Sequence, residues 1–181
     1  NIKITSSNKK FNKIKIVAHP DDELIFGGAE LIQNKGYKVI CITNQDNPKR
    51  LKEFTGVMKE LNHGFDILNH KDDSRIKNID KNYLKYIENE LINKNIEKIV
   101  THNKKGEYGH NFHRAVHDMV TDICEKLGLL DKLYYFHTGN KKIDEKLIKT
   151  KLDLMEKHYP SQFKVLVTLN LQKDIENESL K

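Results

Sequence analysis

The side chains most able to do chemistry lie within five consecutive residues, which carry one imidazole and three carboxylates: His19, Asp21, Asp22 and Glu23, with Pro20 between the first two. Three adjacent carboxylates repel one another unless a cation or a proton relieves them. The imidazole of His19 and the carboxylate of Asp22 suit a borderline metal such as zinc. The turn at Pro20 lets both side chains point at one spot and leaves Asp21 nearby without coordinating. The stretch therefore predicts a metal site.

A second segment carries the histidines that could complete this site. A catalytic zinc usually has three protein ligands and leaves a further position for water. Residues 106–113 read Gly-Glu-Tyr-Gly-His-Asn-Phe-His, so His110 and His113 are three residues apart. That spacing brings both side chains close to one face of a helical turn. We expect the third ligand to come from this pair.

Both segments follow short apolar runs that are typical of strands. Ile14–Ala18 is rich in β-branched residues and precedes the first segment, and Ile99–Thr101 precedes the second. Further along the chain, strand-like runs alternate with amphipathic helices. This order predicts an α/β protein, a Rossmann-like three-layer fold with a mostly parallel sheet. Ligands of such sheets bind outside the carboxyl ends of the strands, where both segments would lie.

The expected elements follow from this alternation. The predicted strands cover residues 13–18, 37–43, 65–68, 98–102 and 133–137. The predicted helices cover residues 24–35, 49–62, 81–93, 110–126 and about 143–158. We expect residues 1–12 to be a loose N-terminal lead-in and residues 13–181 to form a single domain. The pattern of residues 163–171 fits either a strand or a helix. Gly27-Gly28 disfavours a helix, which indicates close approach of the first helix to the metal loop.

Charge and cysteine content limit the partners. The net charge is +6, but 29 lysines and only three arginines are dispersed along the chain. A nucleic-acid-binding protein would concentrate them in a stripe, so we expect a small-molecule substrate and no nucleic acid. Cys41 and Cys124 have no metal-ligand spacing and predict buried free thiols in a reducing compartment, hence a cytoplasmic protein.

The sequence contains no apolar run near the ~20 residues of a transmembrane helix, so no membrane segment is expected in this chain. It begins at Asn1 and not at Met, which leaves open whether an anchor or a further domain precedes it. The oligomeric state does not follow from these features.

The motifs together resemble one enzyme family. The stretch Ala-His-Pro-Asp-Asp-Glu at 18–23, Gly-Gly at 27–28 and Gly-His-x-x-His at 109–113 resemble the N-acetylglucosaminyl-phosphatidylinositol de-N-acetylase family (PIG-L, or LmbE-like). Weaker similarities are Arg-x-x-Glu at 50–53, Asp-Asp at 72–73 and His-Tyr-Pro-Ser-Gln at 158–162. The resemblance spans roughly residues 14 to 163.

This resemblance implies a metal-dependent N-deacetylase that releases acetate from an N-acetylated amino sugar of the GlcNAc type, nucleotide- or lipid-linked. It implies one divalent metal, Zn²⁺ by default, with His113 as the third ligand. Asp21 would be the general base, and His110 would protonate the departing amine. The implied substrate contacts are Tyr108, Arg50 and either Asp72 or Asp73. An arginine pairs well with a phosphate and an aspartate with sugar hydroxyls, so Arg50 and these aspartates together favour a phosphate-bearing amino sugar.

One position departs from the family pattern. Many bacterial members carry an aspartate directly before the ligating histidine, where it can tune the catalytic histidine; here that residue is Phe112. The acid role of His110 therefore has less support, and its pKa is expected to be set differently.

The remaining candidates receive ordinary interpretations. Glu23 is expected to hydrogen-bond the metal loop, and His117 is expected to pack away from the site. Four histidines without motif neighbours are expected on the surface or in the core: His63, His70, His102 and His137.

Three alternatives stay open. The same site could act on a different amide, as in the thiol-conjugate amidases of the family. A Mg²⁺-dependent phosphohydrolase could use the carboxylate cluster, but two histidine ligands argue against it. A nucleic-acid-binding protein would need an arginine-rich face that the sequence lacks.

Overall fold

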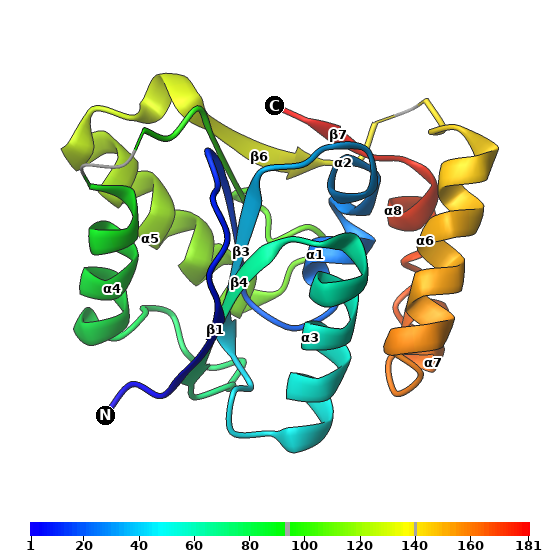
Figure 1. Cartoon of the computed structure of the whole chain (residues 1–181), viewed down its shortest axis with the longest axis horizontal. Coiled ribbons are helices and arrows are strands. Elements are labelled where there is room, and N and C mark those ends of the chain that lie inside the picture. Colours follow the sequence, from blue (N-terminus) through cyan, green and yellow to red (C-terminus); the bar gives the residue numbers. More distant parts are fainter. Residues whose placement is uncertain (93–94, 140) are drawn as a thin grey trace.

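A mostly parallel sheet lies at the centre of this computed structural model, which describes residues 1–92, 95–139 and 141–181 (Figure 1). Over these residues the sheet has seven strands in the order β1-β4-β3-β2-β5-β6-β7. They are β1 Ile4–Ser7, β2 Lys13–Val17, β3 Tyr37–Thr43, β4 Gly64–His70, β5 Lys98–Thr101, β6 Leu133–His137 and β7 Ser179–Leu180. Strands β2 to β6 pair in parallel, and the edge strands β1 and β7 pair antiparallel.

Helices cover both faces of this sheet. They are α1 Asp22–Ile25, α2 Gly28–Gln33, α3 Pro48–Leu61, α4 Lys81–Leu91, α5 Asn111–Leu127, α6 Glu145–His158, α7 Phe163–Thr168 and α8 Gln172–Glu176, with a 3₁₀ turn η1 at Leu130–Lys132. Figure 1 shows α4 and α5 on one side of the sheet and α3, α6, α7 and α8 on the other. The predicted Rossmann-like three-layer α/β fold is confirmed.

The central strands are buried on both faces, which explains their continuous apolar character. In β3, Val39 and Cys41 belong to the core under α3 and α6, whereas Ile40 and Ile42 belong to the core under α4 and α5. Successive side chains of a strand point to opposite faces. Two separate apolar cores therefore hold the three layers together.

The strand order creates the crevice that holds the site. After β2 the chain first adds β3 and β4 on one side, and it then returns to the other side of β2 with β5. The connections that leave the carboxyl ends of β2 and β5 therefore diverge. Both motif segments directly follow these two strands, so the fold brings them together.

Two expectations about elements were wrong. The lead-in at residues 1–12 contains strand β1, which pairs antiparallel with β4, because an edge strand needs a backbone partner and no long apolar run. The helix expected over 24–35 is divided into α1 and α2 at Gly27. The ambiguous segment 163–171 contains helix α7. The expected end of the third helix at Asn93 lies outside the described residues.

The glycine pair admits two buried lysines. A Cβ on Gly27 would lie 2.3 Å from Lys15 Nζ, and one on Gly28 would lie 3.1 Å from Lys151 Cε. Lys15 Nζ donates to the carbonyl of Gly27 at 2.8 Å, and Lys151 Nζ donates to the carbonyl of Ile25 at 2.9 Å. The close approach expected at this pair is thus made with side chains, those of Lys15 and Phe136 at Gly27 and those of Leu24 and Lys151 at Gly28, and not with the loop of residues 19–23.

Lys151 also ties the C-terminal segment to this turn. Its ammonium pairs with the Glu178 carboxylate at 3.0 Å, and neither side chain is more than 5% exposed. The same carboxylate accepts from the backbone N–H groups of Ala29 and Glu30 at the start of α2.

The described part of the chain contains no helix that is both long and apolar enough to cross a membrane. Cys41 and Cys124 are buried free thiols, as expected.

We predict that Lys151→Met lowers the free energy of unfolding by about 3–5 kcal/mol, because it leaves the Glu178 carboxylate buried without its partner charge. Denaturant titration followed by circular dichroism measures this loss. Lys149→Met on the same helix is the control, because the Lys149–Asp153 pair is exposed and its loss should not measurably change stability. Equal stability of the two variants would contradict the prediction.

Candidate active site

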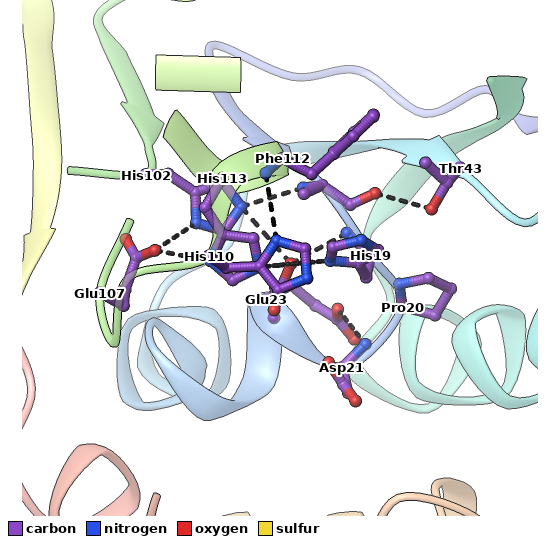
Figure 2. Close-up of polar contacts among 12 residues, drawn as sticks. His19, Pro20, Asp21, Glu23, Thr43, His102, Glu107, His110, Phe112 and His113 are labelled. Carbon is purple, nitrogen blue, oxygen red and sulfur yellow. Dashed lines mark hydrogen bonds and ion pairs between the residues drawn. The ribbon is translucent and has the colours of Figure 1, made fainter. Parts of the chain in front are cut away.

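The two motif segments meet at the carboxyl ends of β2 and β5 (Figure 2). His19 and Asp22 lie directly after β2, with Asp22 as the first residue of α1. His110 is the N-cap of α5, and His113 lies in its first turn. Residues separated by some 90 positions in the sequence are therefore direct neighbours.

Three donor atoms converge in this crevice. His19 Nδ1 lies 3.2 Å from His113 Nε2, and Asp22 Oδ2 lies 3.4 Å from the former and 3.3 Å from the latter. In a tetrahedral zinc site with bonds of about 2.0–2.1 Å, neighbouring ligand atoms are about 3.3 Å apart. Residues His19, Asp22 and His113 thus form a candidate metal-binding triad whose spacing and donor types fit a divalent metal.

The surroundings keep Asp22 ionised, as a ligand must be. Burial disfavours its charge, but contacts with His113, His102 and His19 outweigh this effect and hold its pKa well below the usual value. Burial also favours the neutral ring of His19, yet its hydrogen bonds to Asp22 and Asp72 raise its pKa to about 9. A metal ion that binds His19 must therefore displace a proton.

Asp21 lies beside the triad in an unusual backbone conformation. Its φ is +99°, and its N–H donates to Glu23 Oε2 at 3.0 Å. Burial and the neighbouring Asp22 charge raise the pKa of Asp21 well above its usual value, against the opposing effect of Arg50. Glu23 also accepts from the Tyr159 hydroxyl, so the expectation that Glu23 hydrogen-bonds the loop is confirmed.

Arg50 reaches the site from the first turn of α3. Its Nη2 lies 3.3 Å from the Asp21 carboxylate and also donates to the carbonyl of Pro20. Its Nη1 pairs with Glu53, and its guanidinium lies 5.6 Å from the centre of the Tyr159 ring. Although Arg50 lines the cavity, most of its guanidinium N–H groups already donate to Pro20, Asp21 and Glu53.

His110 presents one defined tautomer when neutral. Its Nδ1 accepts the N–H of Phe112 at 3.1 Å, so the ring hydrogen lies on Nε2. Burial and the neighbouring rings of His113 and His19 lower its pKa to about 4. Phe112, which replaces the family's aspartate, is fully buried against the His19 ring at 5.5 Å and supplies no counter-charge. His110 is consequently neutral at pH 7.

Of the two aspartates that were candidate substrate contacts, one lines the cavity and the other does not. Asp72 Oδ1 lies 3.0 Å from His19 Nε2 at the edge of the cavity, whereas Asp73 pairs with Arg75 at 2.7 Å. Asp72 is therefore the aspartate that faces the site. Tyr108 is 42% exposed, and the centre of its ring lies 5.9 Å from that of His110. Burial and nearby carboxylates raise the Tyr108 pKa, so its hydroxyl stays protonated.

The cavity in front of the triad has a volume of about 230 Å³ and two unlike walls. Its polar lining is His19, Asp21, Asp22, Asn44, Arg50, Asp72, Tyr108, His110 and Gln162. Its aliphatic lining is Ile25, Val165, Leu166, Leu169 and Leu171, mostly from α7 and the turn after it. An occupant with a polar and an apolar side fits both walls.

Two residues without an assigned role from the sequence lie behind the triad. His102 is fully buried and stacks on the His113 ring with a centroid distance of 4.0 Å. Glu107 Oε2 accepts from His113 Nδ1 at 2.7 Å. His102 lies in the core with both ring nitrogens hydrogen-bonded, as expected of a core histidine, but its contacts with the site were not predicted. Its signal was its position directly after β5, which matches that of His19 near the end of β2. His117 hydrogen-bonds the carbonyl of His102 and packs against the Tyr135 ring, so it does not join the triad, as expected.

Comparisons with known proteins show which family the chain belongs to. The family model PIG-L, GlcNAc-PI de-N-acetylase, matches residues 14–124. An uncharacterized protein of Acanthamoeba polyphaga mimivirus is 35% identical over 174 residues, which cover 87% of this chain and 74% of that protein.

Solved structures resemble the fold at low identity. The A40926 pseudoaglycone deacetylase superposes with a TM-score of 0.65 and 17% identity, covering 87% of this chain and 85% of that one. A deacetylase triple mutant of the teicoplanin biosynthetic pathway gives 0.68 and 15%, covering 90% and 88%. Both the family model and the mimivirus relative extend over most of the chain, and the matched region contains every residue of the triad. This chain therefore belongs to the PIG-L family of deacetylases.

Proposed function

We propose that this protein hydrolyses the acetamide of an N-acetylated amino sugar of the GlcNAc type and releases acetate. The observation that carries the proposal is the convergence of the His19, Asp22 and His113 donor atoms in the cavity that Asp21 also lines. Metal-dependent amide hydrolysis needs a Lewis acid and a base within reach of one water molecule. Family membership supports the same reaction class.

His19, Asp22 and His113 would hold the metal, with Zn²⁺ as the default for two imidazoles and one carboxylate. When bound, such an ion polarises a carbonyl group and acidifies water. The chain's own contribution is to hold these donors with their lone pairs directed at one point. The N–H of His19 helps by donating to Asp22 Oδ2 at 2.9 Å.

Asp21 would take the proton of the attacking water as general base. A base works best when its pKa approaches the working pH, and burial together with the Asp22 charge shifts Asp21 in that direction. Arg50 opposes this shift, and its guanidinium holds the carboxylate in place. The positive φ of Asp21 costs backbone energy, which is typical of a residue aimed for function.

The Nε2–H of neutral His110 and the Tyr108 hydroxyl would donate to the oxyanion of the tetrahedral intermediate. Because His110 is neutral at pH 7, protonated Asp21 returns its proton to the departing nitrogen as the C–N bond breaks. The products are acetate and a free amine. His110 thus keeps its catalytic position, with oxyanion stabilisation as its main role.

The carboxylate of Asp72 would accept hydrogen bonds from sugar hydroxyls, and Gln162 could contact the far end of the substrate. A phosphate on the substrate would compete with Asp21 and Glu53 for Arg50.

The aliphatic wall of the cavity also favours a second candidate, a non-sugar or thiol-conjugate amide with an apolar group. Acetate release from nucleotide-linked, lipid-linked and free N-acetylhexosamines tests the sugar proposal. Activity on non-sugar acetamides alone would replace it with the second candidate.

We expect His113→Ala to abolish stoichiometric metal binding, because it removes one of three ligands. Elemental analysis of the purified variant measures metal content, and chelator treatment of the wild type should abolish acetate release in parallel. His117→Ala, one turn further along α5, is the control and should retain the metal. Full metal content in His113→Ala would refute this ligand assignment.

Asp21→Asn should keep the metal while lowering kcat by about 10²–10⁴-fold, the usual contribution of a positioned base. Steady-state acetate release and metal content are measured on the same preparation. Asp73→Asn serves as the matched control, because Asp73 pairs with Arg75 outside the cavity and its loss should leave kcat unchanged. Loss of metal from Asp21→Asn would make Asp21 a ligand and not the base.

For Arg50→Gln we expect kcat to fall about ten- to a hundredfold, because misplacement of Asp21 by a fraction of an ångström disrupts proton transfer. Since the guanidinium contacts Asp21, the fall should be equal for phosphorylated and unphosphorylated substrates. Parallel kcat and KM measurements on both substrates check this. A selective rise in KM for the phosphorylated one would instead assign phosphate recognition to Arg50.

A further inference from the structure

A buried carboxylate lies behind the metal triad and contacts two histidines at once. Glu107 Oε2 lies 2.7 Å from His113 Nδ1 and 3.0 Å from His102 Nδ1. Its other oxygen, Oε1, accepts the N–H of Asn103 at 3.0 Å. The Glu107 side chain is 3% exposed, and both histidine side chains are fully buried. None of these contacts uses the atoms that face the cavity.

The backbone fixes where the hydrogen of His102 lies. The N–H of Ala18, at the end of β2, donates to His102 Nε2 at 2.9 Å. Because a backbone N–H can only donate, Nε2 carries a lone pair and the ring hydrogen lies on Nδ1, where it meets Glu107. Asp22 Oδ2 is farther from this Nε2, at 3.4 Å. His102 therefore connects β2 to Glu107 in one defined tautomer.

The same carboxylate fixes His113. An ionised Glu107 can only accept, so His113 Nδ1 carries a hydrogen, and in the neutral ring the lone pair then lies on Nε2. That lone pair faces His19 Nδ1 at 3.2 Å and Asp22 Oδ2 at 3.3 Å. The tautomer that Glu107 selects is thus the one that a metal ligand requires.

The loop that presents Glu107 is held against its conformational preference. Glu107 has a φ of +57°, between Gly106 at +68° and, two residues on, Gly109 at +100°. Asn103 Oδ1 accepts from the N–H groups of Lys105 and Glu107, which closes the loop. A non-glycine residue in the left-handed region points to a positional requirement.

We propose that Glu107 and His102 are positioning residues: Glu107 orients His113 and raises its basicity, and His102 holds Glu107 in register with β2. The inference rests on the metal triad of the proposed function and goes beyond it. Carboxylates that accept from a ligating histidine typically change metal affinity by about 10–100-fold.

His102, Glu107 and His113 also group closely enough to hold an ion of their own. The hydrogen bonds oppose this use. Ala18 occupies Nε2 of His102, and the Nδ1 atoms of both rings carry the hydrogens that Glu107 accepts. The proposal therefore requires one metal per chain.

The test compares Glu107→Gln with Glu30→Gln in the metal-free full-length protein, with Zn²⁺ affinity measured by competition against a chelating dye. Glutamine cannot accept from both histidines while also accepting from Asn103, and it carries no charge. Glu30 is the matched control, because it is a partly buried carboxylate whose oxygen accepts from Lys98 at 2.7 Å, away from the triad. Melting temperatures of the metal-free variants separate loss of stability from loss of affinity.

We expect Glu107→Gln to weaken Zn²⁺ binding about 10–100-fold and Glu30→Gln to change it less than twofold. An unchanged affinity in Glu107→Gln, or equal weakening in both variants, would overturn the proposal while leaving the triad intact. A wild type that binds no Zn²⁺ would overturn the triad itself. If Glu107→Gln does not fold, ¹H–¹⁵N NMR of the Zn²⁺-bound wild type decides: a downfield His113 Nδ1–H resonance protected from exchange, as a carboxylate hydrogen bond requires, supports the proposal, and a rapidly exchanging one overturns it.

Discussion

The burial of several carboxylates in one crevice is the constraint on which the site depends. Asp21, Asp22, Glu23 and Glu107 lie within the connections after β2 and β5 and are all largely shielded from water. Each would be costly alone. The structure relieves them one by one: Arg50 faces Asp21, three histidines surround Asp22, Tyr159 donates to Glu23, and two imidazole N–H groups donate to Glu107. A divalent cation would complete this compensation.

Different environments give adjacent carboxylates different chemistry. Asp22 remains ionised because histidines contact it, while burial and its neighbour's charge raise the pKa of Asp21. Groups of the same type whose pKa values are driven apart are characteristic of acid–base sites. The Asp21 backbone has a positive φ, and Figure 2 shows the Asp21 carboxylate apart from the histidines of the triad. A ligand and a neighbouring base can thus come from consecutive residues.

Much of this architecture could be predicted from local patterns. The apolar run before His19 and the run before the Gly-His-x-x-His segment indicated parallel strands, and the strand-end rule then brought their polar residues together. The features that local patterns did not predict depend on tertiary contacts. His102 has no motif, and only the β2–β5 pairing places it under Ala18. Gly27 and Gly28 fall in a predicted helix, but their lack of side chains makes room for Lys15 of β2 and Lys151 of α6.

The contact between Glu178 and the start of α2 has a consequence for the order of folding. The turn that carries Asp22 is made early in synthesis, yet the carboxylate that accepts from Ala29 lies 149 residues later. Contacts of such separation form late, because long segments must first be brought together at a cost in entropy. A nascent chain can therefore assemble β2 and β3 while α2 still lacks its acceptor. The start of α2 gains this acceptor only after the segment that carries Glu178 has left the ribosome.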